Sequence, residues 1–208
     1  MIDNLNLSLI LTVALLTFIS PGPATLSIAG TSMALGRKHG LTLAAGVITG
    51  SLFWSISAAL GLGAVLQANE WVFHVIRYGG AAYLLYLAYK SARSALLPGD
   101  IKTRVVSATT PLRAYTKGLI VNVTNPESVL FYGSLYAIGM PKNPSDPQIA
   151  IAIGALGILV IFLYVGFALI FSNSFITRGY LKLYRWLEGF FALAFTAASI
   201  EVLLAKIQ

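Results

Sequence analysis

The chain has 208 residues, of which 57% are hydrophobic and 10% charged, whereas soluble domains are typically about 45–50% apolar and about 25% charged. The chain has only 14 basic and 7 acidic side chains, which are too few charged groups to cover the surface of a water-soluble fold of this size. The absence of cysteine excludes disulfides, thiolate metal sites and thiol redox chemistry. We therefore expect an all-α membrane protein with no separate soluble domain.

Six membrane-spanning helices are predicted from the gaps between charges. The stretches 4–36, 40–69 and 147–177 carry no Asp, Glu, Lys or Arg, and each is long enough to cross about 30 Å of hydrocarbon. Three other apolar segments contain isolated charges. Because no basic stretch precedes the first helix, we expect it to be retained rather than cleaved as a signal peptide. The predicted helices cover about 6–30, 41–66, 71–94, 114–138, 148–172 and 180–204.

Basic residues set the predicted orientation. With both termini outside, all but three of the 14 Lys and Arg residues lie on the inner side, the exceptions being Arg77, Lys142 and Lys206. Cytoplasmic loops of membrane proteins carry such an excess. The segment from Lys90 to Arg113 is interpreted as a topology determinant and lipid contact. The net charge of +7 thus needs no nucleic-acid partner.

The chain also shows a weak internal repeat. The first predicted helix carries Ser-Pro-Gly-Pro around Pro21, and the fourth carries Thr-Asn-Pro-Glu around Pro126, 105 residues later. A repeat of three spans reverses its direction in the membrane because three is odd. We predict one transporter domain over 1–208, built from two inverted three-helix halves of about 1–105 and 106–208, with the first and fourth helices broken.

The two breaks are the predicted functional site. Proline opens a helix because it lacks an N–H and its ring clashes with the preceding turn. Freed backbone groups persist in hydrocarbon mainly where they line a polar cavity, and the N-terminus of a half-helix favours a carboxylate. The alternative is an ordinary pair of helix kinks. We assign substrate-binding or gating roles to Pro21, Gly22, Pro23, Thr25, Asn125, Pro126 and Glu127.

Two of these residues have simpler interpretations as well. Glu127 is an ionisable residue inside a span and thus a candidate proton carrier or cation-binding group. It also follows a helix-starting proline, where the helix dipole favours an acid, and a buried basic group would pair with it. Asn125 suits either substrate contact or capping of the second half-helix.

Five segments carry a family resemblance. They read FISPGPATL at 18–26, GRKHGL at 36–41, GVITG at 46–50, GGAAYL at 79–84 and GLIVNVTNPE at 118–127. In this order and spacing they resemble the lysine exporter (LysE/RhtB) family of bacterial amino-acid efflux proteins. The resemblance implies proton-driven export of amino acids or similar small metabolites across the bacterial inner membrane. That family usually has Lys after Asn-Pro where this chain has Glu127, so no substrate identity is carried over.

We therefore expect a secondary active exporter of amino acids or related zwitterions that uses no cofactor or metal. The alternatives are a membrane assembly protein without transport and an exporter of another small solute. An enzyme is not expected, because the chain lacks G-x-S-x-G and places His39 and His74 near opposite membrane faces. The oligomeric state is open, since the small-residue pair Gly46 and Gly50 suits contacts within or between subunits.

Overall fold

The computed structural model confirms the all-α class over the residues that it describes, which are 5–20, 22–68, 70–97, 110–141 and 143–204. The helices are α1 (Leu7–Ile19), α2 (Pro23–Ala68), α3 (Glu70–Leu96), α4 (Pro111–Val123), α5 (Pro126–Gly139), α6 (Asp146–Ile170) and α7 (Ser174–Leu204).

Three of the described helical stretches are long and apolar enough to cross a membrane, by length and composition: Pro23–Gly61, Asp146–Ile170 and Leu183–Leu204. The apolar helix α1 has only 13 residues. The helices at the third and fourth predicted spans are α3, which contains Lys90 and Arg93, and the short pair α4 and α5. A helical membrane protein is therefore supported, and the full count of six spans stays a prediction.

The first and fourth predicted helices, in which breaks are expected, are each interrupted. Between α1 and α2 the helical structure stops at Ile19 and resumes at Pro23, while Pro21 lies outside the described residues. Between α4 and α5 it stops at Val123 and resumes at Pro126. Pro23 and Pro126 occupy the first position of the helices that resume. Proline suits this position because the N–H that it lacks would have no hydrogen-bond partner within the helix there.

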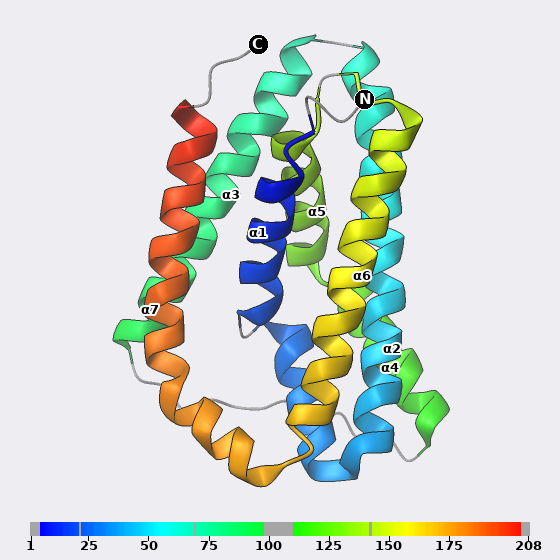
Figure 1. Ribbon diagram of the computed structural model, residues 1–208, viewed down its shortest axis with the longest axis vertical. Helices are drawn as coiled ribbons and strands as arrows, with labels where there is room; N and C mark the ends of the chain where they lie inside the picture. The colour runs from blue at the N-terminus through cyan, green and yellow to red at the C-terminus, as the bar shows by residue number, and fades with distance from the viewer. Residues whose placement is uncertain (1–4, 21, 69, 98–109, 142, 205–208) are drawn as a thin grey trace.

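One departure from the predicted boundaries lies at Gly36. Two helical segments of α2 meet at this residue, whose backbone is not helical, with φ +79° and ψ 174°. Side chains rarely tolerate that left-handed backbone, whereas glycine adopts it without steric cost. The segments 23–35 and 37–68 therefore run in opposite directions along the bundle without a separate loop (Figure 1).

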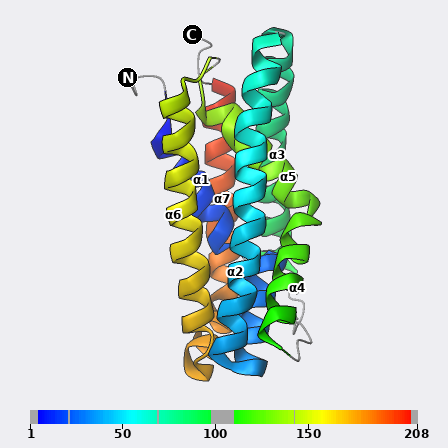
Figure 2. The same cartoon turned by 90° about the vertical axis from the view of Figure 1, so that its right-hand side faces the viewer.

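The bundle is held together by close backbone contact and by an apolar core. α2 packs against α4 and α6, and α3 packs against α7, as the two views show (Figures 1 and 2). A Cβ on Gly46 would collide with the main-chain oxygen of Tyr115, and one on Gly118 with that of Leu43. The small residues thus allow α2 and α4 to approach within this chain, and Gly46 gives no reason to invoke a second subunit.

The two halves of the chain run in opposite senses. In Figure 1, α1 descends, α2 descends and then rises after its bend, and α3 descends. α4 and α5 rise, α6 descends and α7 rises. In chain order the first half therefore runs down, up and down, and the second half runs up, down and up. The start of α1 and the end of α7 lie toward the same end of the bundle.

Candidate functional site

A cavity of about 130 Å³ lies where α1 ends and where α2 and α5 begin, and α3, α4, α6 and α7 also contribute to its wall. Its volume is similar to that of cavities of about 150 Å³ that accommodate a benzene-sized molecule. Most of the residues that line it are polar or charged. The polar and charged lining residues are Thr17, Ser20, Thr25, Ser51, Tyr83, Lys90, Ser91, Ser94, Asn122, Asn125, Glu127, Ser128, Tyr132, Tyr164, Tyr184 and Glu188.

Five of the predicted site residues line this one cavity, although they come from segments about a hundred residues apart. They are Gly22, Pro23, Thr25, Asn125 and Glu127. Pro126 starts α5, is exposed and is not part of the lining. Pro21 lies outside the described residues.

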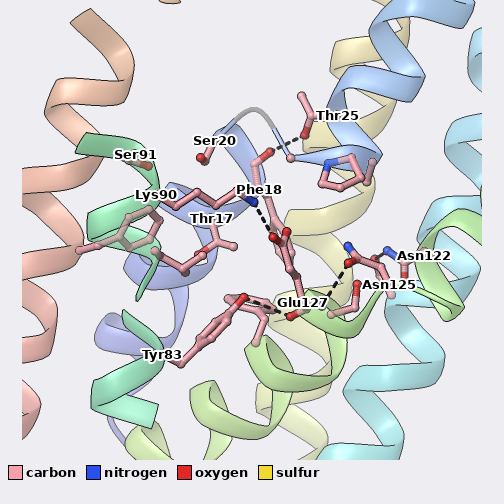
Figure 3. A pocket seen from close by; sticks show the side chains of 18 of the residues that line it. Thr17, Phe18, Ser20, Thr25, Tyr83, Lys90, Ser91, Asn122, Asn125 and Glu127 are labelled. Atoms are coloured by element: carbon pink, nitrogen blue, oxygen red, sulfur yellow. Dashed lines mark hydrogen bonds and ion pairs between the residues drawn. The ribbon is translucent and has the colours of Figure 1, made fainter. Parts of the chain in front are cut away.

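Glu127 forms an ion pair with Lys90, as Figure 3 shows, and the Nζ and Oε1 atoms are 2.5 Å apart. Glu127 lies in the first turn of α5, where the helix dipole stabilises a carboxylate, and Lys90 reaches it from α3. The interpretation of Lys90 as a lipid contact is therefore wrong for its side chain, which lines the cavity, whereas its role as a topology determinant stays a prediction. The sequence could not show that α3 directs this lysine inward.

The two helix interruptions are stabilised by local hydrogen bonds. The Asn125 side chain accepts a hydrogen bond from the Glu127 N–H at 3.1 Å, so it caps α5 as one of its interpretations foresaw. The Thr25 hydroxyl donates to the main-chain oxygen of Phe18 at 3.2 Å and links the start of α2 to the end of α1. The Tyr83 hydroxyl donates to the Glu127 main-chain oxygen at 3.1 Å. The polar backbone at the breaks is thus held in place by named side chains.

Aromatic rings form the apolar part of the wall. Phe18 lies 5.3 Å from Phe131 and 5.7 Å from Tyr164 between ring centroids, within the range of favourable ring contacts. All three side chains are buried. The cavity thus combines an aromatic wall with charged and amide groups, as small-molecule binding sites commonly do.

Asn122 is a lining residue that the predicted site omitted. Its side chain is 3% exposed, and its Nδ2 donates to the Ser51 hydroxyl at 3.1 Å. Its Oδ1 is buried without a hydrogen-bond partner among the described residues. Gly50 leaves the space that Asn122 occupies, because a Cβ there would lie 2.9 Å from the asparagine Cβ. A buried amide oxygen of this kind is suited to accept a hydrogen bond from a ligand.

Glu188 is the second omitted residue. It lines the cavity from α7, is only 4% exposed, and its Oε2 has no hydrogen-bond partner among the described residues. The available signal was an ionisable residue inside an apolar span. Among the described residues, no group of three or more His, Cys, Asp or Glu side chains is placed to hold a metal ion.

The lining residues also pair across the two halves. The two proline breaks are 105 residues apart. When 105 is added to the number of a lining residue in the first half, the result is often the number of a lining residue in the second half. The pairs are Thr17 with Asn122, Ser20 with Asn125, Gly22 with Glu127, Pro23 with Ser128, Tyr83 with Glu188, and Lys90 with Phe195.

Several known proteins are similar to this chain. The family model for LysE type translocators matches residues 15–206. The threonine efflux protein of Escherichia coli K12 is 27% identical over 96% of this chain and 100% of its own length. The leucine efflux protein of Klebsiella pneumoniae is 35% identical over 79% of this chain and 77% of its own. That of Enterobacter sp. strain 638 is 32% identical over 78% and 76%. No solved structure matches the chain significantly.

Proposed function

The chain belongs to the LysE type translocators, which are transporters and not enzymes, and on that basis we propose that it is a secondary active exporter of amino acids or closely related zwitterions. The efflux proteins of threonine and leucine among its relatives support this substrate class. We place the protein in the bacterial inner membrane as a multi-pass protein, and we assign the proton gradient as its energy source.

A six-span inverted repeat accounts for the bundle. The bend at Gly36 divides Pro23–Gly61 into two segments of opposite direction, and α1 extends the first of these across the break. The pair α4 and α5 supplies the equivalent broken span in the second half. The opposite directions of the two halves in Figure 1 and the pairing of lining residues at a spacing of 105 support the repeat.

The basic residues support an orientation with both termini outside. Arg37 and Lys38 follow the bend in α2, Arg93 lies in the last turn of α3, and Arg113 lies in the first turn of α4. These parts of the helices gather at the lower end of the bundle in Figure 1. The positive-inside rule assigns that end to the cytoplasm.

The cavity is our proposed substrate site, and it is the observation that carries the function. A zwitterion needs a cation for its carboxylate and acceptors for its ammonium group. Lys90 has N–H donors beyond the one that meets Glu127, and α2 and α5 begin at the cavity, where helix N-termini favour anions. The unpartnered Oδ1 of Asn122 is a ready acceptor for the ammonium group.

Export from right-side-out cells or vesicles preloaded with labelled threonine and leucine tests this function. Wild-type protein should export at least one of them in a protonophore-sensitive manner, and Glu127→Gln should reduce that export. Lys38→Gln is a matched control, because Lys38 is exposed and is not part of the cavity lining. If wild-type protein exports neither amino acid nor any other component of a labelled amino-acid pool, the proposed function is wrong.

A further inference from the structure

We propose that Glu188 is the proton-binding group of the carrier: it holds a proton in the empty cavity and exchanges it for the ammonium group of the substrate. This inference rests on the proposed function and moves the proton site away from Glu127, the candidate that the sequence suggested. It follows from the different surroundings of the two carboxyl groups that line the cavity.

The first step of the argument is the pairing of charges. Among the described lining residues, Lys90 is the sole cation, and Glu127 and Glu188 are the two acids. Lys90 lies 2.5 Å from Glu127, whose side chain is 26% exposed. Glu127 therefore has a counter-ion, a helix N-terminus and partial exposure to stabilise its charge. It needs no proton.

The second step is the burial of Glu188. The residue is 4% exposed, and one of its carboxyl oxygens has no hydrogen-bond partner among the described residues. An ionised carboxylate in this situation is costly, whereas a protonated carboxyl group carries no charge. With Lys90 engaged by Glu127, the charges in the cavity balance only when Glu188 is protonated or faces another cation.

The groups around Glu188 do not remove this imbalance. α7 packs against α3 and α1, and α1 has no titratable side chain between Leu7 and Ile19. The positive charge of Lys90 attracts the Glu188 carboxylate from a distance. The hydroxyls of Ser91, Ser94 and Tyr184 lie around the Glu188 carboxyl group as hydrogen-bond donors. The other titratable groups near it or in the cavity lining are Tyr83, Glu127, Tyr132, Tyr164 and Tyr180. None of these supplies a second cation.

The exchange step follows directly. On the inner side the substrate ammonium group approaches the Glu188 carboxyl group, the O–H proton passes to water, and the carboxylate accepts hydrogen bonds from the ammonium group. On the outer side a proton from solution adds to the carboxylate. The neutral acid no longer holds the ammonium group by charge, and the substrate leaves. One proton enters the cell for each substrate exported, and no electron is transferred.

The protonation state is tested by infrared spectroscopy of the full chain reconstituted in lipid vesicles without amino acid. We expect a carboxylic-acid carbonyl band at neutral pH that is absent in Glu188→Gln and retained in the exposed control Lys38→Gln. Wild-type protein titrated to alkaline pH should lose the band, which is a measurement independent of any variant. A wild-type spectrum without a band at neutral pH, or a band that persists in a folded Glu188→Gln protein, overturns the proposal.

The exchange is tested with labelled threonine and leucine in the same vesicles and with an internal pH indicator. Wild-type protein should couple amino-acid movement to proton movement, whereas Glu188→Gln should lose both amino-acid accumulation and proton movement at least tenfold, and the exposed control Lys38→Gln should retain both. Proton movement that survives in Glu188→Gln, or wild-type transport without it, overturns the inference and leaves the exporter function intact. Absence of wild-type transport, with the infrared band present, instead refutes these two amino acids as substrates.

Discussion

Replacing Lys90 with Gln removes the cation from the cavity and leaves Glu127 without its partner. The variant loses one charge-assisted hydrogen bond to the substrate carboxylate, worth about 1.5–3 kcal/mol, so substrate affinity should fall about 10- to 100-fold. The fold should also lose stability. Because the Lys90 and Glu127 side chains are 43% and 26% exposed, the loss lies between that of surface and buried pairs, at about 1–2 kcal/mol.

The double variant Lys90→Gln, Glu127→Gln separates the two effects. It removes the uncompensated carboxylate, so the thermal unfolding midpoint in detergent should return close to the wild-type value. Its affinity for labelled threonine or leucine, measured by concentration-dependent transport in vesicles, should remain as low as in the single lysine variant. Recovery of affinity together with stability would refute a direct role for Lys90 in binding substrate. Lys38→Gln should leave both measurements unchanged.

Three further predictions concern the helices that shape the cavity. Gly118→Val should lower the unfolding midpoint by the equivalent of about 3 kcal/mol, because its side chain would collide with the Leu43 main-chain oxygen of α2. Gly133→Ala, whose Cβ has no neighbour within 4 Å, should change it little, and equal effects would contradict the close approach. Asn125→Ala should cost about 1 kcal/mol of stability through the lost cap, with Asn125→Asp retaining most of it. Gly36→Val should cost about 1–2 kcal/mol at φ +79°, and Gly36→Asn less, as judged by thermal unfolding. An asparagine variant as unstable as the valine variant would count against the backbone explanation.

The fold could be predicted from the chain because charges are costly in hydrocarbon. The uncharged stretches therefore located the apolar helices, and Asp146–Ile170 starts and ends within two residues of the predicted 148–172. The chain reversal at Gly36 falls within the loop expected between the first two spans, but its tightness was not predicted. Helical structure reaches this glycine from both sides, and only the backbone angles at Gly36 show that no longer loop is needed.

The candidate site could be predicted in part for a similar reason. Proline in the interior of a helical segment interrupts it, so the breaks pointed to Gly22 and Asn125 without knowledge of the packing. The roles of Lys90 and Glu188 depend on which faces of α3 and α7 turn toward the cavity. In a membrane the outward face of a helix is as apolar as the inward one, so hydrophobic periodicity does not distinguish them.

The pairing of lining residues at a spacing of 105 has a consequence for the direction of transport. The charged or acidic groups Lys90, Glu127 and Glu188 have as counterparts Phe195, Gly22 and Tyr83, none of which is charged at neutral pH. In the proposed inverted repeat, these side-chain charges therefore break the two-fold relation between the halves. A carrier built from two inverted halves switches between its inward-facing and outward-facing states when the halves exchange conformations. Because the three groups have no charged counterparts in the other half, their distance from the open end of the cavity would differ between the two states. The inward-facing and outward-facing states are then unequal in affinity, and that inequality favours release on one side of the membrane.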